Sequence, residues 1–152
     1  MPGKAEARLI YSSISTSERV NELGAKGMLL YILLIAHADG QGRLSGSSKA
    51  IKAMVAPLLD ELTVDDIEQA LDNMQRKDLV IRYLEQEGEI FAYSSPDEEG
   101  RPLIQIVDWW EWQDRLSIKT ASHYPPPNQW EDRVTPRDER GRIRSAGQDT
   151  GR

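Results

Sequence analysis

One predicted helix carries polar side chains that match the hydrogen-bonding edges of DNA bases. Gln69, Asn73 and Arg76 follow one another at intervals of four and three residues, so they share one face of a helix that begins after Thr63. Asn and Gln pair with the edge of adenine, and Arg pairs with that of guanine. Cations that could neutralise phosphates lie around the start of the preceding predicted helix. These cations are Arg43, Lys49 and Lys52.

Acids on the same predicted helix oppose contact with DNA. Four of them lie on or beside its outward face, where they would repel phosphates: Asp65, Asp66, Glu68 and Asp72. Acids near the start of a helix and bases near its end also complement the helix dipole, so a solvated surface explains the pattern. The acids keep a second interpretation open, an interface for a protein partner, formed by Asp65, Glu68, Asp72 and Trp110.

The chain beyond this helix is equally poor in positive charge. Between Arg82 and Arg101 there are six acids and no further Lys or Arg. The predicted hairpin in this segment is therefore poorly suited to bind phosphates. Trp109-Trp110-Glu111-Trp112 follows. Aromatic rings can stack on single-stranded bases, but such large side chains are mostly buried. We predict that two of the three tryptophans pack on the central helix and that one stays at the surface.

Neither catalysis nor metal binding is indicated by any group of residues. The chain has no cysteine and only two histidines, His37 and His123. Asp39-Gly40-Gln41-Gly42-Arg43 begins like a calcium loop, but Arg43 stands where an oxygen ligand is needed. We therefore predict a binding protein rather than an enzyme, with no cofactor, no metal and no small-molecule substrate.

Hydrophobic periodicity predicts the helices that position these side chains. Nine consecutive apolar residues, Met28 to Ala36, predict a central helix over residues 25–38, buried on every side because every side is apolar. This run is far shorter than the roughly 20 residues that span a bilayer. Thr63 and Asp66 form an Asp variant of the capping box at the start of the third main helix. That helix has one apolar stripe, made of Ile67, Ala70, Leu71 and Met74.

Shorter elements complete the expected order. A brief helix follows Ser17, a minimal strand lies at Arg43-Leu44, and a helix covers residues 49–56. Strand patterns over residues 79–84, 90–93 and 103–107 come after the third main helix. We predict a mainly α fold with a small β-hairpin (α+β), in the order of a winged helix-turn-helix with a buried central helix.

Composition and charge divide the chain into three parts. Its 152 residues suffice for one core, and its net charge is −6. From residue 128 onward six arginines face five acids, and few residues are apolar. We predict a flexible N-terminal arm (1–14), a folded domain (15–124), and a Pro-rich exit with a disordered, Arg-containing tail (125–152). Without a signal peptide or a membrane segment, the expected location is the cytoplasm.

The turn after the predicted central helix resembles the turn after the first main helix of phage replisome-organiser and DnaD-like replication proteins. Its sequence is His37-Ala38-Asp39-Gly40-Gln41-Gly42-Arg43-Leu44. Further matches are Gly46, Lys49, Pro57, Val64…Ile67…Leu71, Leu79-Val80, Ile104-Gln105-Ile106, Trp109…Trp112-Gln113 and the Pro-rich exit after Tyr124. The resemblance covers about residues 15–127. It implies a winged-helix domain that acts in replication initiation through DNA binding, self-association or recruitment of a helicase loader. For a phage protein, the location is the cytoplasm of the bacterial host.

These observations leave three functions open. The first is a phage or prophage replication-initiation accessory protein, a winged-helix module that binds DNA, primosome partners or both. The second is a protein-interaction module that keeps the winged-helix shape without reading DNA, and that oligomerises or docks on a host protein. The third is a transcription regulator, because fold alone does not separate these roles.

Overall fold

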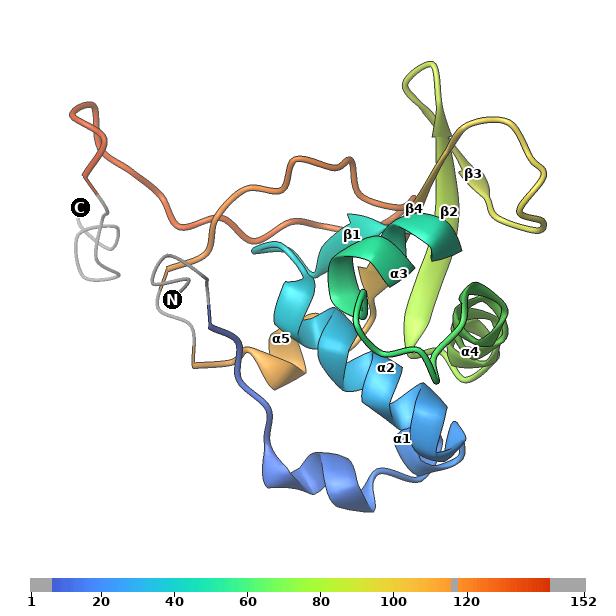
Figure 1. The fold of residues 1–152 in the computed structure, drawn as a ribbon. Coiled ribbons are helices and arrows are strands. Elements are labelled where there is room, and N and C mark those ends of the chain that lie inside the picture. Colours follow the sequence, from blue (N-terminus) through green and yellow to red (C-terminus); the bar gives the residue numbers. More distant parts are fainter. Residues whose placement is uncertain (1–6, 116–117, 143–152) are drawn as a thin grey trace.

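The computed structural model describes residues 7–115 and 118–142, which form an α+β fold (Figure 1). Its helices are α1 (Glu18–Asn21), α2 (Gly24–His37), α3 (Ser48–Val55), α4 (Val64–Arg76) and α5 (Trp109–Trp112). Its strands are β1 (Arg43–Ser45), β2 (Val80–Gln86), β3 (Glu89–Ala92) and β4 (Arg101–Ile106). A 3₁₀ turn, Ser12–Thr16, precedes α1. The main helices and strands predicted from the sequence are all present, with ends that differ by at most two residues.

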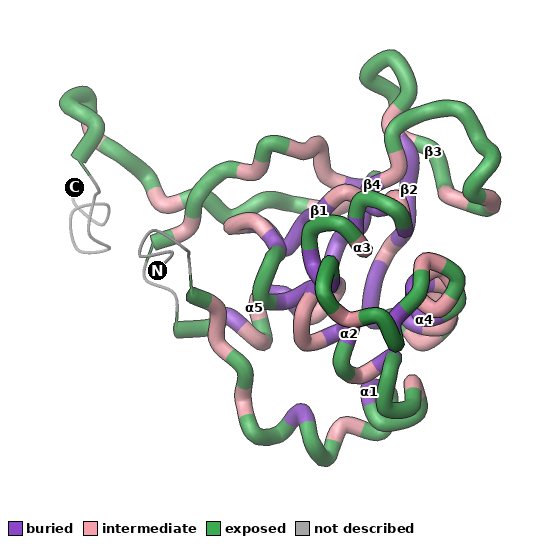
Figure 2. The backbone as a smooth tube through the Cα atoms, in the orientation of Figure 1, coloured by how far each residue is buried: buried purple, intermediate pink, exposed green. Residues whose placement is uncertain are grey.

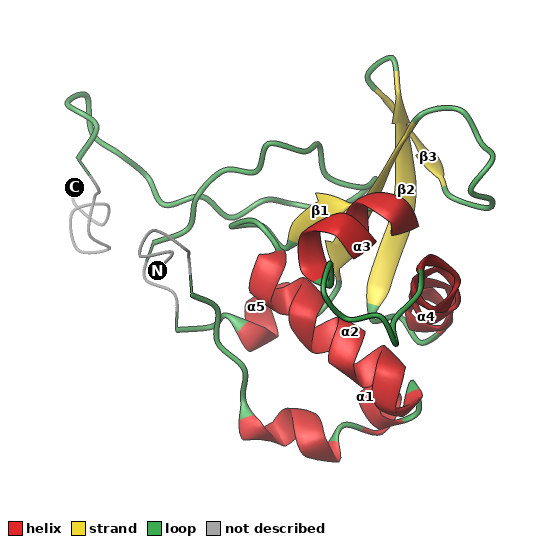
Figure 3. Ribbon diagram, viewed as in Figure 1, coloured by secondary structure: helices red, strands yellow, loops and turns green. Residues whose placement is uncertain are grey.

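The four strands form one antiparallel sheet in the order β1-β4-β2-β3. Leu44, Ile104 and Arg82 lie opposite one another across β1, β4 and β2, so their side chains share a face. This inner face packs against the helices (Figure 3). Gln105 is paired with Arg43 on one side and Ile81 on the other, and these residues belong to the opposite, outer face.

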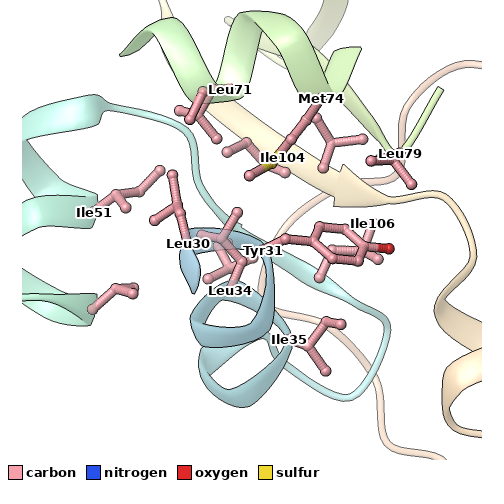
Figure 4. Packing of buried hydrophobic residues seen from close by; sticks show 14 of the residues in the cluster. Leu30, Tyr31, Leu34, Ile35, Ile51, Leu71, Met74, Leu79, Ile104 and Ile106 are labelled. Atoms are coloured by element: carbon pink, nitrogen blue, oxygen red, sulfur yellow. The ribbon is translucent and has the colours of Figure 1, made fainter. Parts of the chain in front are cut away.

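Helix α2 supplies the centre of the hydrophobic core (Figure 4). Four of its side chains are fully buried: Leu30, Tyr31, Leu34 and Ile35. The prediction that every side of this helix is buried is wrong, because Leu29 is 40% exposed and Ala36 also faces solvent (Figure 2). The neighbouring elements cover only part of its circumference. Within the described ranges, no helix is long and apolar enough to cross a membrane.

The start of α4 matches the predicted capping box. The Asp66 amide donates to Thr63 Oγ1 at 3.1 Å, and the Thr63 amide donates to Asp66 Oδ2 at 3.0 Å. The predicted apolar stripe is buried as well, at Ile67, Ala70, Leu71 and Met74. Because the stripe fixes the rotation of α4 about its axis, it also decides which side chains face outward.

The tryptophan segment packs against the core, but the predicted surface tryptophan is wrong, because Trp110 and Trp112 are both partly buried against the core. Trp109 is fully buried, and its indole N–H donates to the carbonyl of Gly40 at 3.1 Å. Trp112 donates to the hydroxyl of Tyr31 on α2 at 2.9 Å. The backbone passes so close to Trp109 at Gly42, where φ is +82°, that a Cβ would lie 2.6 Å from the ring. Glycine is required there both by this contact and by the left-handed conformation.

The described part of the N-terminal arm contacts the folded domain. The Gln113 side chain donates to the carbonyl of Leu9 and accepts from its amide, both at 3.0 Å. Ile14 is buried in the core. These contacts place residues 9–14 against the domain, whereas residues 1–6 lie outside the described part of the chain.

The described part of the C-terminal segment also contacts the folded domain. Residues 118–135, which we call the strap, lie on the outer face of the sheet as two extended legs (Figure 1). The Thr135 amide joins the legs by donating to the Lys119 carbonyl at 2.8 Å. This arrangement was not predicted from composition, because the strap has few apolar residues and is held mainly by polar side chains of the domain. The last part of the predicted tail, residues 143–152, lies outside the described residues.

Candidate functional site

A groove of about 430 Å³ opens between α3, α4 and the loop that joins β3 to β4. The first residues of α3 and α4 form one wall, and Tyr93 and Glu98 belong to the other. Both helices begin there because their N-cap residues end the preceding loops: Ser47 accepts from the amide of Ala50, and Thr63 accepts from that of Asp66. The groove is thus positioned by two capped helix ends.

Glu68 is the centre of a polar network behind this groove. Its carboxylate accepts from the two terminal nitrogens of Arg82 at 2.9 and 3.0 Å, from Ser48 Oγ at 2.6 Å, and from the Tyr93 hydroxyl at 3.2 Å. The Arg82 guanidinium also lies 3.9 Å from the centre of the Tyr93 ring. One carboxylate therefore joins α3, α4, β2 and Tyr93, the residue that follows β3.

The hydrogen bonds from Arg82 are the main reason that the pKa of Glu68 lies below its ordinary value. Burial opposes this effect, and Ser48 and Tyr93 add to it. The Arg82 side chain is only 2% exposed, and its Nε has no hydrogen-bond partner within the described residues. A buried guanidinium with one unmet donor depends strongly on its carboxylate partner.

Arg82, Ser48 and Tyr93 were missed by sequence reasoning. The signal was nevertheless present for Arg82, which lies two residues from Val80 and from Leu84 in a strand whose inner face is apolar. Side chains two apart in a strand share a face, so an arginine at this position needs a buried carboxylate partner. The sequence did not indicate which acid that would be.

Two of the six candidate DNA-contacting residues, Arg43 and Lys52, are bonded to other parts of the fold. The Arg43 side chain is fully buried on the outer face of the sheet and forms an ion pair with Asp132. With the strap in place, the Arg43 guanidinium is therefore not accessible to a phosphate. Lys52 donates to the carbonyl of Leu59 at 2.6 Å and thereby ties the end of α3 to the following loop.

The other candidates lie at the surface but do not form one cationic site. Arg76 is paired with Asp72 one turn earlier on α4, and Gln69 on that helix is exposed. Asn73 is partly buried. Lys49 is exposed at the rim of the groove, and the described residues provide it with no ion pair.

The candidate interface residues are divided between two places. Asp65 and Glu68 line the groove, and Asp72 lies further along α4. Trp110 lies under the strap: the charged groups of Arg133 and Lys119 are 5.3 and 5.8 Å from the centre of its ring. Its interface is therefore internal, with the chain's own C-terminal segment.

Acidic groups dominate the groove. Asp65 is exposed at one wall, and the Glu98 carboxylate accepts from the amides of Ser94 and Ser95 at the other. The hydrogen bonds from Ser94 hold the pKa of Glu98 below its ordinary value, so this group stays charged at neutral pH. Lys49 is the one cation among the described residues that line the groove. The charge favours a cationic ligand over a phosphate.

Within the described residues, no group of three or more His, Asp or Glu side chains is arranged to hold a metal ion. The groove offers hydrogen-bonding and charge complementarity, which are properties of a binding site. Comparison with known proteins gives no match for this chain: no family model, no curated protein and no solved structure is significantly similar to it.

Proposed function

We propose that this chain is a winged-helix-shaped protein-interaction module that docks a basic segment of a replication-initiation partner. The element order, α2, β1, α3, α4 and then the hairpin, supports the winged-helix assignment. The resemblance of residues 15–127 to replisome-organiser and DnaD-like proteins supports the replication context.

The observation that carries the proposal is the acidity of the groove beside α4. Phosphate neutralisation supplies most of the affinity of DNA-binding proteins. Here Asp65 and Glu98 line the groove, while Arg76 is neutralised by Asp72. A duplex would meet repulsion at this face, whereas lysine or arginine side chains of a partner would meet opposite charge.

A charge substitution in the groove tests the proposal. We expect Asp65→Asn to weaken binding of a fluorescein-labelled peptide of alternating glycine and lysine about threefold at low salt, because an exposed pair contributes about 0.6 kcal/mol. Asp60→Asn is the matched control, since Asp60 is an exposed acid of the loop between α3 and α4 that does not line the groove. Fluorescence anisotropy gives both affinities. Equal losses from the two substitutions would mean that the peptide senses only net charge.

A duplex experiment addresses the rival function. We expect no gel shift of a mixed-sequence duplex at about 50 mM salt, and light scattering gives the oligomeric mass under the same conditions. A salt-sensitive shift that Lys49→Ala and Arg76→Ala together abolish would overturn the proposal in favour of direct DNA binding.

A further inference from the structure

The outer face of the sheet is built around polar side chains that the strap covers. Gln41, Arg43 and Gln105 are all fully or almost fully buried there, although each carries several hydrogen-bonding groups. Tyr83 lies on the same face, and burial raises its pKa. Buried polar groups are costly unless they are satisfied, so this face requires a polar ligand.

Gln41 binds the main chain of both legs of the strap. Its side-chain nitrogen donates to the carbonyls of Thr120 and Arg133, both at 2.6 Å, and its side-chain oxygen accepts from the Arg133 amide at 3.0 Å. These are contacts to backbone groups, which any residue offers. Gln41 therefore recognises an extended chain and not particular side chains.

Arg43 adds a requirement for a carboxylate. Its guanidinium forms a two-pronged pair with Asp132 and donates to the carbonyl of Tyr124 at 3.1 Å, while its Nε donates to Gln105 at 2.7 Å. Fork-to-fork pairing of this kind combines affinity with geometric specificity. The Arg43 side chain is fully buried, whereas that of Asp132 is 32% exposed, so the arginine belongs to the domain and the aspartate comes from outside it.

Few side chains of the strap are fully buried. Pro127 is the one buried residue among positions 118–135 that the structure describes, and the Ile118 and Val134 side chains are about half exposed. The Tyr83 hydroxyl supplies a further main-chain contact by donating to the Pro125 carbonyl at 2.6 Å. The strap is thus held largely through its backbone and the Asp132 carboxylate, with further side-chain contacts such as the bond from the Ser122 hydroxyl to Asp39.

We propose that the outer face of the sheet is a recognition site for an extended, aspartate-bearing segment, which the strap fills in cis and which such a segment of a partner protein takes by displacing it. Charge complementarity defines this partner: the guanidinium of Arg43 requires a carboxylate whenever a bound segment buries it. Opening of the strap exposes Arg43 to water, so a segment that then occupies this face needs a carboxylate in the place of Asp132. This site is on the opposite side of the sheet from the acidic groove and requires a ligand of opposite charge.

Attachment in cis gives the strap an effective concentration in the millimolar range. The test therefore weakens the strap in the full-length chain with Asp132→Asn and adds a fluorescein-labelled peptide of residues 118–137. We expect this peptide to bind the Asp132→Asn chain at least about tenfold more tightly than it binds the unsubstituted chain. A peptide that itself carries Asp132→Asn is expected to bind at least about tenfold more weakly. The Glu131→Gln chain is the matched control and should behave like the unsubstituted chain, because Glu131 is exposed and Arg43 pairs with its neighbour.

A second measurement keeps the proposal testable if Asp132→Asn prevents folding. Hydrogen exchange of residues 118–135 in the unsubstituted chain should accelerate when the unlabelled peptide is added at several millimolar, and the Asp132→Asn peptide should have no such effect. An Asp132→Asn chain that folds but binds no peptide would overturn the proposal, and so would unchanged exchange of the strap at saturating peptide. The strap would then be an inseparable part of the fold.

Discussion

Replacing Glu68 with alanine is expected to lower the free energy of unfolding by about 3 kcal/mol. The substitution leaves the Arg82 guanidinium, which is 2% exposed, without the carboxylate that accepts from both of its terminal nitrogens. It also removes the acceptor of the Ser48 and Tyr93 hydroxyls. Urea denaturation followed by circular dichroism measures the loss. Glu61→Ala, which removes an exposed acid before α4, should change stability by less than about 0.5 kcal/mol.

A double substitution separates the buried charge from the pair itself. Replacing a buried ion pair with apolar residues of similar size is often neutral or stabilising. We therefore expect Glu68→Leu combined with Arg82→Met to regain most of the stability that Glu68→Ala loses. If the double variant were as unstable as Glu68→Ala, the loss would come from packing at this position, and the unpaired Arg82 charge would not be its cause.

The same pair makes stability depend on pH in a predictable direction. The pKa of Glu68 is lower in the folded state than its ordinary value of 4.5, chiefly because of Arg82. Its contribution is therefore present above the unfolded pKa and is lost as the pH falls through the folded pKa. We expect the stability difference between the unsubstituted chain and Glu68→Gln to be constant from pH 7 to about 5 and to shrink below that. A difference that grows on acidification would contradict the lowered pKa.

Replacing Trp109 with alanine is expected to cost about 4 kcal/mol. Trp109 is fully buried in the core, it fills the space that Gly42 leaves open, and its indole N–H is bonded to the Gly40 carbonyl. The cavity would lie between α2, the turn after it and α5. Thermal and urea unfolding measure the effect. Trp110→Ala is the comparison, because Trp110 is only partly buried under the strap, and its loss should cost less than half as much. Equal losses would mean that Trp110, under the strap, contributes as much to the free energy of unfolding as Trp109 in the core.

The N-terminal half of α4 shows how much local sequence determines. Thr63 and Asp66 form their capping box within four residues, and the apolar stripe from Ile67 to Met74 depends only on helical periodicity. The strands were predictable for the same reason, since their patterns are local. Even the outward position of Gln69 follows from the stripe.

Burial of charged residues was not predictable in this way. Arg43 was predicted to be an exposed cation near the start of a helix. Its burial depends on Gln105, 62 residues away, and on Asp132, 89 residues away. Similarly, Arg82 and Glu68 are 14 residues apart on different elements. The exposed side of α2 was not predicted. An apolar run shows that a helix is able to be buried on every side, but it does not show how many neighbouring elements surround the helix.

The sequence by itself determined the elements, their order and the turns between them, because caps, glycines and apolar periodicity act over a few residues. Only the tertiary structure decided which charges are available to a partner and where the C-terminal segment lies. The reason is physical: the state of a charged side chain is set by its solvation and by its nearest opposite charge. In this protein both depend on residues that are distant in the chain.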